Sequence, residues 1–161
     1  MSTLTVKPID ESDHSWVKAL LTDHWGGPEI VTRGMIHHAD RLPGFKALLD
    51  GKAIGLLTYR LGTDECEIMS LNSLTEGIGV GTMLMTTARQ LAVACDFRRI
   101  WLITTNDNTR AVKFYVKLGY RIAAVHAGAI AESRRLKPSI PLIGINGVEI
   151  RDEIEMELIL R

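Results

Sequence analysis

The chain has 161 residues, of which 46% are hydrophobic and 24% are charged, and this balance predicts one globular domain over residues 1–161. Lys and Arg together number 19, as do Asp and Glu, and the net charge of zero argues against a dedicated binder of nucleic acids or membrane surfaces. The sequence contains no apolar run of the roughly 20 residues that span a bilayer, no secretory signal at its start, and only two cysteines, Cys66 and Cys95, without metal-ligand spacing. We therefore expect a cytoplasmic protein with reduced thiols, no metal site, and no nucleic-acid or membrane partner.

Apolar periodicity and turn signals predict five segments before residue 75. In chain order these are a strand over 4–9, a helix over about 10–26, a short helix with a loop over 28–43, a hairpin over 45–61 and a strand over 65–74. The first helix is expected to begin after Asp10, whose carboxylate can accept from free backbone amides, and to end at the Gly26-Gly27-Pro28 stop signal. The hairpin is placed by its Asp50-Gly51 turn.

The second half of the chain continues with helices and strands in alternation. We expect a helix over 80–95, a strand over 98–106, a helix from the cap Asn108 to Gly119, a strand over 120–130, a loop or short helix over 132–141, a hairpin turn within 143–150 and a last strand over 153–160. In the last strand, Glu153, Glu155 and Glu157 alternate with apolar residues, which predicts one buried and one wet face.

The order of these elements indicates the fold class. The hairpins require antiparallel strand pairs, whereas the strand–helix–strand unit over 65–106 suggests a parallel pair joined by a right-handed crossover. The sequence therefore predicts an α/β protein of the α+β type, with a mixed, mostly antiparallel central sheet and helices on both faces.

A glycine-rich turn between the strand and the helix is the first candidate site. Gly77, Gly79 and Gly81 stand where free amides and the positive end of a helix dipole could hold an anion. The dinucleotide fingerprint fails, because Thr82 replaces its last glycine and Asp96 precedes the next strand instead of ending it. The triphosphate loop fails because no lysine follows Gly81. A tight turn with close helix packing is the structural alternative.

Two linked motifs make the turn more specific. Residues 76–81 stand in the place of the pattern Gln/Arg-x-x-Gly-x-Gly/Ala, residues 108–111 match Asn-x-x-Ala, and residues 115–120 match Tyr-x-x-x-Gly-Phe/Tyr. In order and spacing this resembles the GCN5-related N-acetyltransferase (GNAT) superfamily. The resemblance implies the acyl-CoA N-acyltransferase fold, with a splayed parallel strand pair, and acetyl-CoA as co-substrate. Glu76 departs from the pattern, since a carboxylate repels a pyrophosphate unless it turns outward or pairs with a cation.

The resemblance also assigns roles to residues. It implies that the cofactor binds Leu71 on the strand, the loop residues Gly77, Ile78, Gly79, Val80, Gly81 and Thr82, and Asn108. Tyr115 matches the general acid that protonates the leaving sulfur; its alternative role is a core aromatic. Ile103 stands where some members carry a glutamate, so Glu67 becomes the best carboxylate for the base, its alternative being an exposed strand residue.

The function implied is an N-acetyltransferase in which a primary amine of a small molecule or a peptide attacks acetyl-CoA directly. The alternative is a catalytically silent CoA-binding regulatory domain, because the base is unsettled. Arg135 and Lys137 could reach an acidic group on a ligand, or belong to a solvated basic surface. The final strands could pair between subunits, which would form a homodimer.

Overall fold

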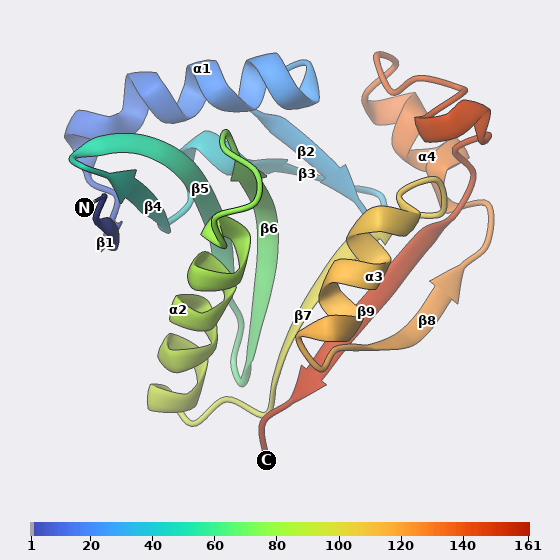
Figure 1. The fold of residues 1–161 in the computed structure, drawn as a ribbon. Helices are drawn as coiled ribbons and strands as arrows, with labels where there is room; N and C mark the ends of the chain where they lie inside the picture. The colour runs from blue at the N-terminus through green and yellow to red at the C-terminus, as the bar shows by residue number, and fades with distance from the viewer. Residues whose placement is uncertain (1) are drawn as a thin grey trace.

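The computed structural model describes residues 2–161, and its centre is a seven-stranded sheet in the order β1-β4-β5-β6-β7-β9-β8 (Figure 1). Its strands are β1 (Leu4–Pro8), β4 (Gly44–Leu49), β5 (Lys52–Leu61), β6 (Glu65–Ser73), β7 (Arg99–Thr105), β8 (Arg121–His126) and β9 (Glu153–Ile159). Every neighbouring pair is antiparallel except β6 and β7, which are parallel and are connected through α2 (Val80–Ala94). The predicted class, α/β with a mixed and mostly antiparallel sheet, is confirmed.

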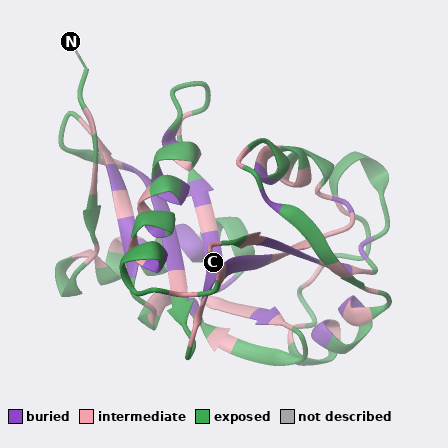
Figure 2. Cartoon of the chain, turned by 90° about the horizontal axis from the view of Figure 1, so that it is seen from below, coloured by how far each residue is buried: buried purple, intermediate pink, exposed green. Residues whose placement is uncertain are grey.

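Helices cover both faces of the sheet, as expected. Besides α2 they are α1 (His14–Trp25), α3 (Thr109–Lys117) and α4 (Ala129–Leu136), with short 3-10 turns η1 (Glu11–Asp13), η2 (Ala39–Arg41) and η3 (Ile145–Gly147). Leu57 of β5 shares a core with Leu84 of α2 and Tyr115 of α3, while its neighbour Leu56 packs with Leu21 of α1 in a second core. Side-chain alternation along β5 thus supplies both layers. Figure 2 shows buried residues along the central strands and on one side of the helices.

The start of α1 follows from reciprocal capping. The carboxylate of Asp10 accepts from the backbone N–H of Ser12 at 2.8 Å, and the carboxylate of Asp13 accepts from the N–H of Asp10 at 3.0 Å. This capping box organises the turn η1, so α1 itself begins only at His14. The helix ends at Gly26 with a left-handed φ of 76°, as the stop signal predicts.

Residues 28–43 include the short 3-10 turn η2, but for most of the segment the prediction of a short helix with a loop is wrong. They contain the hairpin of β2 (Glu29–Thr32) and β3 (Met35–His38), which forms a separate two-stranded sheet. Its turn places Arg33 at φ 50° and Gly34 at φ 71°. Two positive φ values are typical of two-residue hairpin turns, but Asn-Gly or Asp-Gly is the usual sequence there. An Arg-Gly turn between two strands of only four residues is too weak a sequence signal to predict a hairpin.

The segment from residue 120 to β9 also contains less strand than predicted. The strand predicted over residues 120–130 is cut short because α4 follows β8. Asn146 and Gly147 do form a turn with positive φ, but the arms around it pair only through a single bridge between Ile143 and Glu149.

Basic residues fix this connection to the rest of the protein. The Lys137 ammonium donates to the backbone oxygens of Trp25 at 2.6 Å and Glu29 at 2.7 Å, which joins α4 to α1 and β2. Arg134 likewise donates to backbone oxygens of the connection, those of Ile140, Pro141 and Ile150. Lys137 is therefore engaged in the fold, whereas the exposed Arg135 pairs only with Glu132 on its own helix.

The acidic face of β9 is buried, and the prediction of a wet face is wrong. Glu153 is 1% exposed, Glu155 7% and Glu157 8%. The register pairs Glu157 with Trp101 of β7, so the glutamates share that face of the sheet. Arg99 of β7 donates to Glu155 at 2.9 Å and to Glu157 at 2.8 Å. A network of charges from several elements replaces water on this face.

Three further properties of residues 2–161 concern membranes, metals and thiols. No helix in this range is long and apolar enough to cross a membrane. No group of three or more His, Cys, Asp or Glu side chains is arranged to hold a metal ion. Cys66 is buried, Cys95 is exposed, and both are free thiols.

Candidate active site

The site begins with a break in the sheet between its two parallel strands. β6 and β7 pair only from Glu65 opposite Arg99 to Ile68 opposite Leu102. Beyond this point both strands continue without pairing to each other, and they diverge (Figure 1). The splayed parallel pair implied by the sequence resemblance is present.

A β-bulge explains the divergence. On the other side of β6, Thr58 of β5 pairs with Ser70 and Tyr59 pairs with Ile68, so Met69 is an extra residue without a partner. A bulge of this kind bends its strand and increases the local twist. The bend turns β6 away from β7, and it leaves backbone donors and acceptors of β6 free along the edge that faces the gap.

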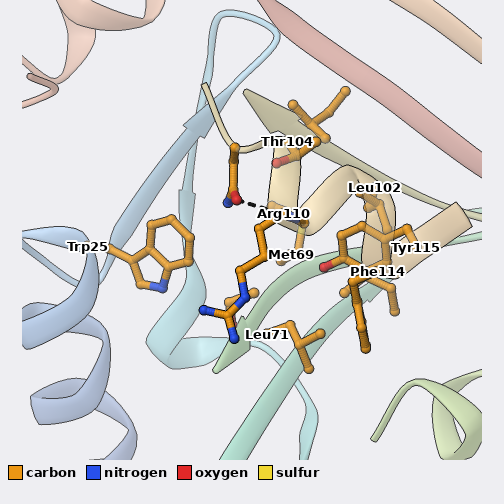
Figure 3. A pocket seen from close by; sticks show the side chains of 13 residues that line it. Trp25, Met69, Leu71, Leu102, Thr104, Arg110, Phe114 and Tyr115 are labelled. Atoms are coloured by element: carbon orange, nitrogen blue, oxygen red, sulfur yellow. Dashed lines mark hydrogen bonds between the residues drawn. The ribbon is translucent and has the colours of Figure 1, made fainter. Parts of the chain in front are cut away.

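A cleft of about 290 Å³ occupies the gap (Figure 3). It is lined by Trp25 at the end of α1, by the bulged part of β6, by the end of β7 and by one side of α3. Three predicted site residues, Leu71, Asn108 and Tyr115, are among its lining residues. The structure therefore brings together side chains that the sequence separates by more than 40 positions.

The glycine turn lies next to this cleft, between β6 and the start of α2. Gly77 and Gly79 have φ values of 82° and 80°, and a Cβ added to either would meet no atom within 4 Å. They are needed for the left-handed backbone, and they leave open space in front of the turn. A Cβ on Gly81 would lie 3.2 Å from the Phe114 ring, so this glycine permits close packing of α2 against α3.

Free backbone amides accompany the turn. The helix-capping residue Gly79 offers no side chain to the first amides of α2, and the first helical bond runs from the N–H of Met83 to the Gly79 oxygen. The N–H groups of Val80, Gly81 and Thr82 precede that bond and have no partner within the helix. Amides at a helix start can bind an anion, and here they adjoin the cleft.

Asn108 serves the fold and the cleft at once. Its side-chain oxygen accepts from the backbone N–H of Ala111 at 3.1 Å, which caps α3. The same residue lines the cleft. The two interpretations of Asn108, a plain cap and a ligand-facing residue, are compatible in this geometry.

Tyr115 combines a buried ring with a hydroxyl at the cleft. Its ring packs against Phe114 at 5.1 Å and Tyr120 at 5.9 Å between centroids. Figure 3 shows the hydroxyl pointing into the cleft. Burial raises the pKa of this hydroxyl, so it stays protonated at neutral pH. A protonated phenol at the edge of a cleft can donate a proton to a developing anion.

Glu67 is placed differently from Tyr115. It is 3% exposed, so the alternative of an exposed strand residue is wrong, and it accepts from the Arg60 guanidinium at 2.9 Å. It does not line the cleft, although its neighbour Ile68 does. The sequence-based hypothesis of a base at Glu67 therefore concerns a carboxylate held beside the cleft by an arginine.

The structure adds cleft residues that the motifs do not assign. Trp25 reaches the cleft from α1, and its indole N–H donates to the Asn72 side chain at 3.3 Å. Arg110 lines the cleft from the start of α3 and pairs with Glu76 at 3.1 Å. Arg110 lies within the quoted Asn-x-x-Ala motif, which could have indicated it. Trp25 carries no such signal, because only the tertiary fold brings α1 to β6.

Comparisons with known proteins agree with this geometry. A family model described as "Acetyltransferase (GNAT) family" matches residues 9–120. The uncharacterized protein YdhI of Bacillus subtilis (strain 168) is 46% identical over 142 residues, which cover 85% of this chain and 89% of the relative. The uncharacterized protein YxbD of the same organism is 38% identical over 152 residues, which cover 94% and 96%.

Solved structures share the fold over nearly the whole chain. An IAA acetyltransferase from Bacillus cereus ATCC 14579 has a TM-score of 0.77 at 20% identity and covers 98% of this chain and 100% of its own. A Bacillus subtilis acetyltransferase in complex with CoA has a TM-score of 0.73 at 18% identity, with 99% and 100% covered. A GNAT family acetyltransferase from Elizabethkingia anophelis with acetyl-CoA bound has a TM-score of 0.73 at 17% identity, with 98% of both chains covered. Identities this low establish likeness of fold alone.

Proposed function

The chain belongs to the acetyltransferase (GNAT) family, and from this premise we propose that it transfers an acetyl group from acetyl-CoA to a primary amine of a small molecule or a peptide by direct attack. The observation that carries the proposal is the cleft at the β6–β7 splay, with the Tyr115 hydroxyl inside it and the free amides of α2 beside it.

The residues around the cleft fit a cofactor that has an extended arm and a pyrophosphate. Left-handed Gly77 and Gly79 leave space in front of Ile78 and of the amides of α2, and these amides suit an anion. The free edge of β6 near Leu71 can exchange backbone hydrogen bonds with an amide-containing arm such as pantetheine. Asn108 lies on the opposite wall of the same cleft.

The proposed chemistry needs two proton transfers. When the amine attacks the thioester carbonyl, the C–S bond breaks and the sulfur leaves with the electron pair. Tyr115 donates its proton to that sulfur, a role that its protonated hydroxyl in the cleft supports. The amine loses a proton, and Glu67 is proposed as its acceptor through water, with the Arg60 bond fixing the carboxylate. Cleavage of the thioester leaves Tyr115 as a phenolate and Glu67 protonated, and transfer of that proton through solvent restores both groups.

Two measurements test this proposal. Calorimetry with CoA is expected to show saturable binding, and mixing acetyl-CoA with a panel of amines is expected to release free thiol in proportion to acetylated amine. Absence of CoA binding would contradict the proposal, because every role above depends on the cofactor.

The silent CoA-binding domain is retained as a second candidate because the cleft lining, within residues 2–161, lacks a carboxylate. Ile103 lines the cleft where an acidic base would be useful, and Glu67 lies outside the lining. CoA binding without thiol release for any amine of the panel would favour this candidate. A turnover that depends on Tyr115 would exclude it.

A cytoplasmic location and a homodimer also stay predictions. Of the two final strands, β8 is an edge of the sheet and β9 is enclosed between β7 and β8, so a dimer formed through these strands would pair β8 of each subunit. Light scattering at several protein concentrations measures whether a dimer forms.

A further inference from the structure

An ion pair connects α3, which forms one wall of the cleft, with the glycine turn beside the cleft. Arg110 is the second residue of α3, which follows β7, and Glu76 immediately precedes Gly77 in the turn that follows β6. The guanidinium Nη2 of Arg110 lies 3.1 Å from a carboxylate oxygen of Glu76. Figure 3 shows the Arg110 side chain extending into the cleft that Leu71 and Phe114 also line.

This pair contributes little to the fold itself. The side chains of Arg110 and Glu76 are 79% and 74% exposed. Exposed pairs are screened by water and lose side-chain entropy when they form, so they add little stability. Neither residue belongs to the hydrophobic core. The guanidinium can therefore exchange its partner without disturbing the packing of α3.

The surroundings favour an anionic partner for Arg110. The free amides at the start of α2 lie in the same turn region as Glu76, and no side chain caps them. A phosphate group accepts from a guanidinium through two oxygens, and the two phosphates of a pyrophosphate together carry more charge than one carboxylate. Amides and guanidinium could then bind one phosphate group from two sides, while the exposed Glu76 is left to water.

We propose that Arg110 binds the pyrophosphate of the cofactor and that Glu76 is its competing counter-ion in the free protein. This inference rests on the proposed function, since it concerns the phosphates of CoA. It explains how Glu76 is compatible with an anion site: paired with Arg110 it is neutralised, and once released it acts only as a weak competitor. Glu76 therefore lowers cofactor affinity, and Arg110 raises it.

Calorimetry on four proteins tests the inference. CoA is expected to bind about tenfold more weakly to Arg110→Ala than to the wild type. Glu76→Gln removes the competitor and the negative charge, so it should bind CoA several-fold more tightly. In the double variant the gain from Glu76→Gln should shrink, because no guanidinium remains to be released. Lys117→Ala is the matched control, since it removes one exposed cation from the other end of α3, outside the cleft.

Shorter ligands locate the contact. The Arg110→Ala effect should be the same for CoA and 3′-dephospho-CoA, which both contain the pyrophosphate, and absent for pantetheine, which lacks it. A loss confined to CoA would assign Arg110 to the 3′-phosphate and overturn the proposal, as would wild-type affinity in Arg110→Ala. If the wild type fails to bind CoA at all, it is the proposed function that fails. Unchanged thermal midpoints would show that the variants are folded.

Discussion

Tyr115 connects the hydrophobic core to the cleft through one side chain. Its ring packs between Phe114 and Tyr120, while its hydroxyl points into the cleft. Tyr115→Phe keeps the ring and removes only the proton donor, so kcat should fall by about 100-fold, within the usual range for general acid catalysis. Affinity for CoA should change little, because the proposed phosphate and backbone contacts remain. Steady-state thiol release and calorimetry measure the two quantities.

Tyr120 is the matched control for that experiment. Its hydroxyl is buried and has no hydrogen-bond partner within residues 2–161, and burial raises its pKa as it does for Tyr115. Tyr120 does not line the cleft. Tyr120→Phe should therefore keep kcat and should not lower stability, since no hydrogen bond is lost. Equal losses of kcat in the two variants would point to a packing defect instead of acid catalysis.

Two glycines with similar backbone conformations allow the effects of backbone strain and of ligand binding to be measured separately. Gly79 in the glycine turn and Gly51 in the β4–β5 hairpin have φ values of 80° and 84°, and a Cβ on either would meet no atom within 4 Å. Substitution by alanine should cost about 1–2 kcal/mol of folding free energy at both positions, because the Cβ of alanine is strained in a left-handed backbone. Urea denaturation measures this cost. Only Gly79→Ala should also weaken CoA binding, and weakening by Gly51→Ala would show a general effect.

At the scale of elements, Lys137 holds three segments together. It donates to the last carbonyl of α1 and to the first residue of β2, and it lies directly after α4. Lys137→Met keeps much of the aliphatic chain but removes both charged hydrogen bonds, which should cost about 1–3 kcal/mol. Because Trp25 both accepts this bond and lines the cleft, its fluorescence should change as well. Arg135→Met, which removes only an exposed intrahelical pair, is the control.

At the scale of the whole molecule, what the sequence predicts depends on the range of the interactions involved. Local patterns identify the Asp10 cap of η1, the Gly26 end of α1, the cap of α3, the Asp50-Gly51 hairpin and the glycine turn, because each depends on neighbours within a few residues. The linked motifs also predict the cleft residues Leu71, Asn108 and Tyr115, because the order and spacing of the motifs along the chain identify these positions.

Features that depend on distant partners could not be predicted. The bulge at Met69 is defined only by its pairing with β5, and Trp25 joins the cleft through the packing of α1. The alternation of glutamates with apolar residues correctly predicted that β9 is a strand, but it wrongly predicted that the glutamates are exposed to water. The arginines that pair with its glutamates come from β7, β8 and the β2–β3 turn, more than 30 residues away in the chain.

The β9 glutamates make opposite contributions to stability, and this can be tested by pH. Burial raises the pKa of Glu157, but bonds from Arg121 and Arg99 outweigh it, so the net pKa lies below the ordinary value. Burial also raises the pKa of Glu153, and there the backbone N–H of Arg33 does not compensate, so the net pKa is raised. A lowered pKa stabilises the folded protein above the ordinary value of about 4.5, and that contribution is lost as the pH falls. A raised pKa has the reverse effect, because ionisation of the buried group is unfavourable in the folded state.

Substitution of Glu157 and of Glu153 by glutamine should therefore change the stability in opposite directions, and both changes should depend on pH. Glu157→Gln should lose about 1–3 kcal/mol at pH 7, since two guanidinium groups lose their charged partner. The loss should shrink as the pH falls below 4.5 and through the lowered pKa of the folded-state carboxylate. Glu153→Gln keeps an oxygen that can accept from Arg33 and carries no charge. It should match the wild type near pH 4 and become the more stable protein as the pH rises above the ordinary glutamate pKa. Urea midpoints at several pH values measure both curves. If Glu153→Gln is less stable than the wild type at pH 7, the prediction is wrong. Interactions beyond the Arg33 hydrogen bond would then offset the cost of burying the Glu153 charge.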